Sequence, residues 1–302
     1  MKHPLFLICS FLIALTTFSQ NVTIPDANFK AALIQKGVDK NGDGQIQKSE
    51  ALNVDSLSLF TNSIVSIVGI EEFTNLVYFS TQMNAIDNVD FTKNKSLVYL
   101  NCSYTNITSI DLSQNSQLKY FNCGYSKNLK SLDLSSNVLL EKIYMTYTKI
   151  SSIDFSKNIN LKDIDFSNNS FTKIDVSKNI NLEQLNCSNN NLTSLAVDLN
   201  NNLTFLDCTK NNSLSKICIN DNQSVLITMN HNNWNKDSNS SWSTDCSVSI
   251  VEIEASNKSS KVLRVYNLIG QEIMQENAND GVYIFQYSDG SVKKKCVITS
   301  GK

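Results

Sequence analysis

The sequence predicts a solenoid of stacked short turns with one parallel β-sheet, because large apolar residues recur at a fixed period. The pattern within one turn is fullest in LEQLNCSNNNLTSLAVDLN, from Leu182 to Asn200. One turn cannot bury its apolar edge alone, so neighbouring turns must stack and form continuous ladders of equivalent side chains. Steps of 21 or 22 residues separate the leucines that begin the turns: Leu76, Leu97, Leu118, Leu140, Leu161, Leu182 and Leu203.

The fourth and sixth positions of each turn are expected to point into the core, because side chains two residues apart lie on the same side of a strand. We therefore place the strand of each turn at these positions. The fourth position holds Phe79, Leu100, Phe121, Ile143, Ile164, Leu185 and Leu206. The sixth position holds Thr81, Cys102, Cys123, Met145, Phe166, Cys187 and Cys208.

Further ladders are expected to line the rest of the coil. Two of them are apolar: Val89, Ile110, Leu132, Ile153, Ile174, Leu195 and Ile217, then Phe91, Leu112, Leu134, Phe155, Val176, Val197 and Ile219. Two are made of asparagine: Asn94, Asn115, Asn137, Asn158, Asn179 and Asn200, and at the ninth position Asn84, Asn169, Asn190 and Asn211. A buried asparagine amide can satisfy backbone groups at a corner, so we interpret these asparagines as structural.

With these repeats, the chain resembles the bacterial leucine-rich-repeat family of internalin-type adhesins and secreted Bacteroidetes proteins that carry a cysteine ladder. The resemblance covers about residues 20 to 246, and its front, IPDANFKAAL, VDKNGDGQIQKSEA and GIEEFTNL, looks like the N-terminal cap of the Bacteroidetes members. It implies a curved, right-handed leucine-rich-repeat solenoid with the parallel sheet on the concave face. Thr81, Met145 and Phe166 depart from the cysteine ladder, and single insertions fall near Lys127 and Ser213.

The N-terminal segment predicts export. Residues 1–19 run from Lys2 and His3 through LFLICSFLIAL to small or polar residues, the layout of a secretory signal peptide. The apolar run is shorter than the roughly 20 residues of a membrane span. Lipid attachment at Cys9 is the lesser alternative, since Ile8 stands where a small residue is needed.

The remaining chain divides into an N-terminal cap at 20–75, the repeats at 76–219, a C-terminal cap at 220–247 and a tail at 248–302. No other segment is long and apolar enough to span a membrane, so the mature chain is expected to have no span. A net charge of -2 gives no electrostatic footprint for nucleic acid.

The tail predicts a small antiparallel β module, with short alternating strands broken by glycines. VYNLIGQEI, GVYIFQY and KKKCVI resemble the type A (Por) C-terminal sorting domain of the type IX secretion system. The resemblance implies a secretion machinery as partner and a place outside the cell or on its outer surface. The tail departs from that pattern in lacking an evident opening strand, and an ordinary β-sandwich fragment is the alternative.

The segment DKNGDGQIQKSE matches the twelve-residue calcium loop D-x-[DN]-x-[DN]-G-x5-E at every constrained position. Gly44 would make the sharp turn and Gln47 would reach the ion through a water. We expect weakly bound, structural Ca²⁺ that orders the cap, the alternative being a loop that keeps this shape without metal. The expected ligands are Asp39, Asn41, Asp43, Gln45 through its carbonyl, and Glu50.

The eight cysteines fall into different classes. Ladder cysteines behave as small buried hydrophobic residues, so free thiols are expected there. Cys218 and Cys246 lie outside the ladder, and a disulfide between them would staple the C-terminal end of the solenoid. Zinc is the rival interpretation, but a single nearby histidine, His231, and the absence of C-x-x-C spacing argue against it.

Seven of the ten tyrosines gather at the third, fifth and eighth positions of the early turns, where side chains should face outward on the concave side. Rigid amphipathic rings suit protein or sugar recognition. The alternative is that tyrosine merely favours strands. Asp163, Asp165 and Asp207 follow on the same face. The candidate ligand-binding residues are Tyr78, Tyr99, Tyr104, Tyr120, Tyr125, Tyr144 and Tyr147.

These features predict a binding protein and not an enzyme. His231 is the only histidine after the signal peptide, and no nucleophile motif or phosphate loop is present in the sequence. The carboxylates of Asp163 and Asp165 lack an obvious cleft on an open solenoid. We expect adhesion to an extracellular protein first, glycan binding second, and an accessory domain of a secreted hydrolase third.

Overall fold

The computed structural model describes residues 20–60, 63–228 and 233–246, together with the backbone of four strands between 262 and 297. The chain divides into two compact units, with the boundary after Thr244. The expected signal peptide at 1–19 and His231 lie outside the described residues. No helix in the described part of the chain is long and apolar enough to cross a membrane.

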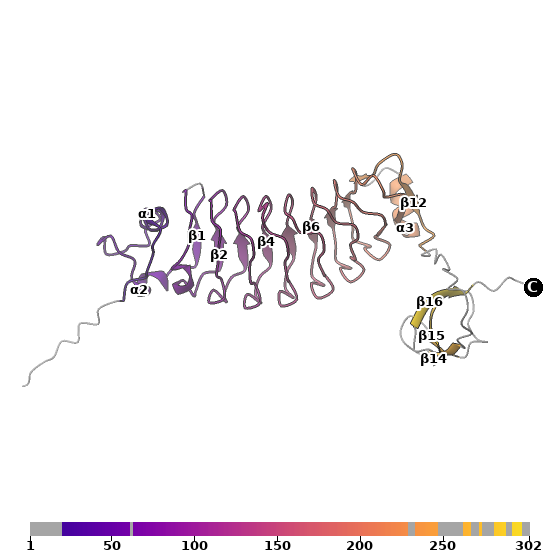
Figure 1. The fold of residues 1–302 in the computed structure, drawn as a ribbon, viewed down its shortest axis with the longest axis horizontal. Coiled ribbons are helices and arrows are strands. Elements are labelled where there is room, and N and C mark those ends of the chain that lie inside the picture. The colour runs from indigo at the N-terminus through magenta and orange to yellow at the C-terminus, as the bar shows by residue number, and fades with distance from the viewer. Residues whose placement is uncertain are drawn as a thin grey trace, which may run out of the picture. The chain divides into compact units, whose positions relative to one another are not determined.

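The first unit is a solenoid whose turns each add one strand to a nine-stranded parallel sheet (Figure 1). Equivalent residues pair in register, so that Phe79, Leu100, Phe121 and Ile143 lie side by side. In sheet order the strands are β1 (Ser56–Ser58), β2 (Tyr78–Ser80), β3 (Tyr99–Asn101), β4 (Tyr120–Asn122), β5 (Lys142–Tyr144), β6 (Asp163–Asp165), β7 (Gln184–Asn186), β9 (Phe205–Asp207) and β11 (Asn233–Asn235).

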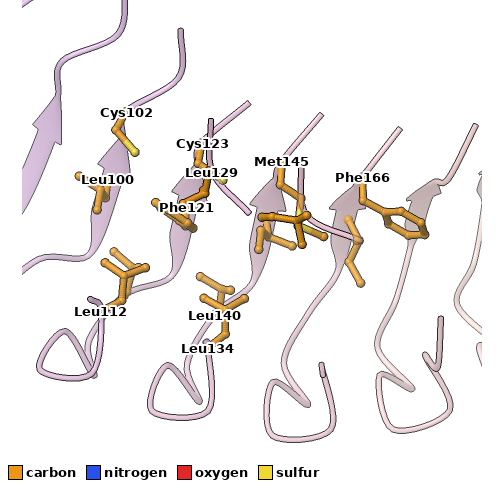
Figure 2. Close-up of a cluster of buried hydrophobic side chains, with 14 of the residues drawn as sticks. Leu100, Cys102, Leu112, Phe121, Cys123, Leu129, Leu134, Leu140, Met145 and Phe166 are labelled. Atoms are coloured by element: carbon orange, nitrogen blue, oxygen red, sulfur yellow. The ribbon is translucent and has the colours of Figure 1, made fainter. Parts of the chain in front are cut away.

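The fourth and sixth positions fill the core as predicted, although each strand ends at the fifth position. Figure 2 shows Cys102, Cys123, Met145 and Phe166 at the same place in successive turns. All four are fully buried, so the larger Met145 and Phe166 replace cysteine without leaving the core. Phe166 also packs against Phe171, with ring centroids 4.8 Å apart.

A second, three-stranded parallel sheet lies at the C-terminal end of the solenoid, in the order β12 (Ser241–Ser243), β10 (Lys216–Cys218) and β8 (Leu195–Ala196). Leu195 and Ile217 are buried there. Their counterparts in the earlier turns, Val89, Ile110, Leu132, Ile153 and Ile174, are only partly buried. This ladder therefore lines the core less completely than the sequence predicts.

The asparagine ladder that begins at Asn94 is structural. Each of its side-chain amides donates to two backbone carbonyls of the turn before it; the Nδ2 of Asn158, for example, donates to Leu134 O at 3.0 Å and Asn137 O at 2.9 Å. The ladder starts on carbonyls of Ile70 and Phe73, at the 3₁₀ helix η1 (Ile70–Glu72).

A residue outside the repeats ends the same ladder. Gln223, on helix α3 (Asp221–Thr228), donates through Nε2 to Val197 O and Asn200 O. It thus supplies the two hydrogen bonds that the next asparagine of the ladder would supply. Both ends of the ladder are closed by groups of the caps.

The N-terminal cap consists of α1 (Ala27–Gln35) and α2 (Lys48–Ala51). Asp26 joins α1 to the first turn: its Oδ1 accepts from Asn28 N and Phe29 N, and its Oδ2 accepts from Val65 N and Ser66 N. Burial alone would raise the pKa of Asp26, but these four N–H donors outweigh it and hold the pKa below the ordinary value.

The cysteines fall into the two expected classes. Cys218 and Cys246 are disulfide-bonded. The described ladder cysteines are free and buried, and burial raises the pKa of Cys102 to about 12, so this thiol stays protonated and unreactive at neutral pH. The free thiols are Cys102, Cys123, Cys187 and Cys208.

The second unit contains a four-stranded antiparallel sheet, as the alternation in the tail predicts. Its longest pairing joins Gly281 to Val297 and Gln286 to Val292. In sheet order the strands are β14 (Glu272–Ile273), β13 (Val262–Tyr266), β15 (Gly281–Tyr287) and β16 (Val292–Val297).

Candidate functional site

A first row of tyrosines crosses the outer face of the nine-stranded sheet. Tyr78, Tyr99 and Tyr120 occupy the third position of consecutive turns and pair in register. Their rings stack, with centroids 4.2 Å and 4.1 Å apart and interplanar angles of 13° and 8°. Burial, followed by the neighbouring Tyr99, raises the pKa of Tyr78 above its ordinary value, which keeps this phenol neutral. We call these residues, with Tyr144, the strand row.

The strand row changes position in the next turn. Lys142 takes the third position of β5, and Tyr144 stands at the fifth. The ring of Tyr144 is tilted by 47° from that of Tyr120, with centroids 5.5 Å apart, so the faces of these two rings are not closed against each other. The Tyr144 hydroxyl donates to Asp163, and burial, then this hydrogen bond, raises the pKa of Tyr144 strongly.

A second row, which we call the bend row, consists of Tyr104, Tyr125 and Tyr147 at the eighth position. Tyr104 and Tyr125 stack at 4.2 Å and 7°, and Tyr125 and Tyr147 at 4.8 Å and 24°. Tyr104 is 45% exposed and Tyr147 is 41% exposed. The two outer rings of the row are therefore open to solvent, and Tyr125 between them is half-buried.

The bend row has a left-handed backbone, with φ of 56° at Tyr104, 60° at Tyr125 and 53° at Tyr147. This conformation is a property of the position, because Met83, Asn168, Asn189 and Lys210 adopt it in the other turns. Asparagine tolerates positive φ, whereas a bulky residue there costs about 1 kcal/mol or more. Strand preference cannot explain these three tyrosines, since their position lies outside the strands and disfavours them.

A hollow of about 270 Å³ lies between the two rows. Its floor is deepened by Gly124, the only glycine at the seventh position of the seven repeats. A Cβ there would lie 3.1 Å from Thr146 Cγ2 and 3.2 Å from Asn122 Oδ1. None of the described residues that line the hollow is charged: Ser103, Tyr104, Tyr120, Asn122, Gly124, Tyr125, Tyr144 and Thr146.

The acidic residues of the same sheet are held by their neighbours. Asp163 accepts from Tyr144 and lies 3.7 Å from the Nζ of Lys142. Asp165 accepts from Ser167 N at 2.9 Å and from Asn186 Nδ2 at 3.2 Å. Asp207 similarly accepts from the backbone and hydroxyl of Thr209. These carboxylates do not line the hollow.

The expected calcium loop has a compatible backbone and donor set. Gly42 and Gly44 have φ of 74° and 77°, which form its tight turns. Asp39 accepts from the N–H groups of Gly42 and Gly44, and both Glu50 oxygens accept backbone N–H groups. The oxygens of these carboxylates are hard ligands of the kind that Ca²⁺ takes.

Two amide groups lie beside the third carboxylate of this loop. Asn41 Nδ2 donates to Asp43 Oδ2 at 3.1 Å, and Gln47 Nε2 donates to the same oxygen at 2.9 Å. Asn41 would have to turn its amide to offer a cation its oxygen. The Gln45 side chain accepts from Lys30, which leaves its backbone carbonyl as the candidate ligand.

The chain supplies its own partner strand to the loop. Val22 N donates to Ile46 O at 2.7 Å, and Lys48 N donates to Gln20 O at 2.9 Å, around an antiparallel bridge between Asn21 and Gln47. Ile46 is buried in the core, as the sequence predicts. A single loop is thereby braced on both sides without a second helix–loop–helix unit.

Comparison with solved structures agrees with this architecture. Internalin C2 from Listeria monocytogenes matches with a TM-score of 0.57 and 15% identity, over 62% of this chain and 84% of that one. The fold is a leucine-rich-repeat solenoid. No family model and no curated protein matches the chain.

Two further structures from Listeria monocytogenes are similar over part of the leucine-rich-repeat chain. The functional domain of InlJ, which includes a cysteine ladder, is 26% identical over 66% of this chain and 56% of its own, with a TM-score of 0.45. The internalin InlF is 17% identical over 74% of this chain and 92% of its own, with a TM-score of 0.43. Both scores lie below 0.5, so the fold assignment rests on internalin C2. The chain spans little more than half of the InlJ domain.

Proposed function

We propose that this leucine-rich-repeat protein binds an extracellular protein through the two tyrosine rows, as an adhesion or recognition protein. The observation that carries the proposal is the left-handed backbone at Tyr104, Tyr125 and Tyr147. Residues held in such a conformation against their preference tend to serve function, and the two turns that follow fill the position with asparagine, at Asn168 and Asn189.

Ring geometry favours a protein over a glycan as ligand. Within each row the rings stack at 4.1 to 4.8 Å, so most ring faces are covered by the neighbouring ring. A sugar that packs on an aromatic ring needs a free face. Edges and hydroxyl groups remain, and these suit the mixed apolar and hydrogen-bonding surface of a protein. Glycan binding is the second candidate.

The test replaces the bend row by the residue that later turns carry, in the triple variant Tyr104→Asn, Tyr125→Asn and Tyr147→Asn. Relief of the left-handed strain, about 1 kcal/mol a site, offsets the lost stacking, so the thermal midpoint should stay the same or rise. Binding to extracellular-protein arrays should fall at least tenfold.

A matched control changes three exposed apolar residues outside the rows, in the variant Val138→Ala, Ile159→Ala and Ile180→Ala. This control should keep the binding of the unchanged protein. Equal binding by the asparagine variant would contradict the proposal, and glycan-array binding that depends on the bend row would establish the second candidate.

We also propose that the chain is exported by the segment at 1–19 and then carried across the outer membrane through the tail at 248–302. The alternating strands of the tail and its KKKCVI segment support this proposal. Deleting residues 248–302 should trap the protein inside the cell envelope, as cell fractionation would measure. Undiminished export of the shortened chain would contradict the sorting role.

Bound Ca²⁺ is the third part of the proposal, with a structural role in the N-terminal cap. The candidate ligands are Asp39, Asn41, Asp43, the Gln45 carbonyl and Glu50. The positive φ of Gly44 and the clustered carboxylates support it. The ion would offset the mutual repulsion of these carboxylates and join α2 to the loop through Glu50.

A further inference from the structure

We infer that the hollow at Gly124 and the channel between the tyrosine rows take a proline-rich segment of the partner protein in the polyproline II conformation. This inference rests on the proposed function and specifies its ligand. Three observations carry it: the chemistry of the lining, the spacing of the turns and the missing side chain at Gly124.

The lining of the hollow matches an uncharged ligand that has hydrogen-bond acceptors. Proline has no N–H group, and a polyproline II helix leaves every carbonyl without an internal hydrogen bond. The hollow is lined by tyrosines of both rows and by Asn122, whose Oδ1 accepts from Gly124 N and whose Nδ2 is a donor. The nearest ion pair, Lys142 with Asp163 at 3.7 Å, is neutral as a pair. A strongly charged ligand would find no counter-charge in the lining.

The spacing of the turns matches the pitch of the ligand. Polyproline II rises about 3.1 Å per residue with three residues per turn, so equivalent residues recur every 9.3 Å or so. Adjacent strands lie about 4.7–4.9 Å apart, so every second turn of the solenoid recurs at about 9.6 Å. A polyproline II segment laid across the strands would thus meet equivalent sites at each of its turns. A β-strand, with a two-residue repeat of about 6.7 Å, would not.

The extent of the rows sets the length of the segment. Tyrosines occupy four consecutive turns, from β2 to β5. Three strand spacings make about 14 Å, which is the length of about five residues in polyproline II. Proline-rich segments dock in aromatic-lined grooves with little loss of conformational entropy, because their conformation is largely fixed before binding.

Gly124 lines the hollow without a side chain. The seventh position holds serine or threonine in neighbouring turns, as at Ser103, Thr146 and Ser167. Gly124 has no left-handed φ that would require glycine, so backbone geometry does not explain it. The missing side chain avoids the close contacts that a Cβ would make with Thr146 and Asn122, and it leaves room in the lining for a ligand ring.

The experiment titrates the full mature chain against a fluorescein-labelled octaproline peptide, with a (Gly-Ser)4 peptide as flexible control. Octaproline should bind saturably, and (Gly-Ser)4 should bind at least tenfold more weakly. Gly124→Ser should weaken octaproline binding at least tenfold, because the new side chain crowds Thr146 and Asn122 in the lining of the hollow. Ser188→Thr, the same position three turns away, is the matched control and should bind like the unchanged protein. Thermal unfolding of both variants checks that they fold.

The outcomes separate this inference from the function on which it rests. Absence of saturable octaproline binding, or binding insensitive to both Gly124→Ser and the bend-row variant, overturns the inference. If octaarginine or a chito-oligosaccharide binds instead, with the same sensitivity to Gly124→Ser, the site is right and the ligand is wrong. If array binding depends on the bend row while octaproline never binds, the proposed function stands and the inference fails. If binding on the arrays does not change in the bend-row variant, both the proposed function and the inference fail.

Discussion

Replacing Asn158 by alanine should lower the free energy of unfolding by about 2 kcal/mol, because two buried hydrogen bonds to backbone carbonyls are lost. Asn158 is fully buried, and its Nδ2 donates to Leu134 O and Asn137 O. Each carbonyl keeps a backbone donor, Asn137 N on Leu134 O and Leu140 N on Asn137 O, so the loss is that of two hydrogen bonds at about 0.5–1.5 kcal/mol each. Chemical denaturation followed by circular dichroism measures the change.

Asn160 offers a matched control two residues along the chain. Its Nδ2 donates to Val138 O at 3.0 Å, and this hydrogen bond is exposed to solvent. Water can replace that hydrogen bond, so Asn160→Ala should change the free energy of unfolding by less than about 0.5 kcal/mol. An equal fall in the free energy of unfolding of the two variants would mean that burial does not determine how much each asparagine stabilises the solenoid.

Calcium should raise the free energy of unfolding by about 2 kcal/mol at 10 mM, if the cap unfolds with the solenoid. This figure follows from a dissociation constant near 10⁻⁴–10⁻³ M, which is usual for extracellular calcium modules, and from binding to the folded state alone. Thermal unfolding in 10 mM Ca²⁺ and in excess chelator measures the difference, and calorimetric titration measures the affinity.

Asp43→Asn should weaken the calcium effect without abolishing it, because the calcium-loop motif allows asparagine at this position. An asparagine at 43 can still accept from Gln45 N, as Asp43 Oδ1 does at 2.8 Å, but it brings no charge to the ion. Asp111→Asn, an exposed aspartate in a later turn with the same bond to a residue two ahead, is the matched control. If a chelator leaves the thermal midpoint unchanged and no calcium binds at millimolar concentration, the loop keeps its shape without metal.

The repeat period was sufficient to predict the fold, because every ladder position carries its own chemical type. Phe79 through Leu206, Cys102 and Asn158 all occupy the buried places that the period assigns. The second sheet escaped prediction, although Ala196 stands where the five earlier turns carry aspartate. Pairing with β10 and β12, at the C-terminal end, makes that strand.

The site was predictable in composition but not in conformation. The sequence placed seven tyrosines on one face, yet it did not give the backbone dihedral angles of Tyr104 and Tyr125. Asn168 and Asn189 at the same position were the available signal, because asparagine is enriched at positive φ. Gly124 gave a second signal, as a glycine where the other repeats carry a side chain.

The asparagine ladder is closed by Ile70 and Phe73 at one end and by Gln223 at the other. Neither closing group depends on how many asparagines stand between them. Duplication or loss of one whole turn would leave both junctions chemically unchanged. The length of the surface offered to a partner can therefore grow or shrink by single repeats, independently of the machinery that protects the two ends.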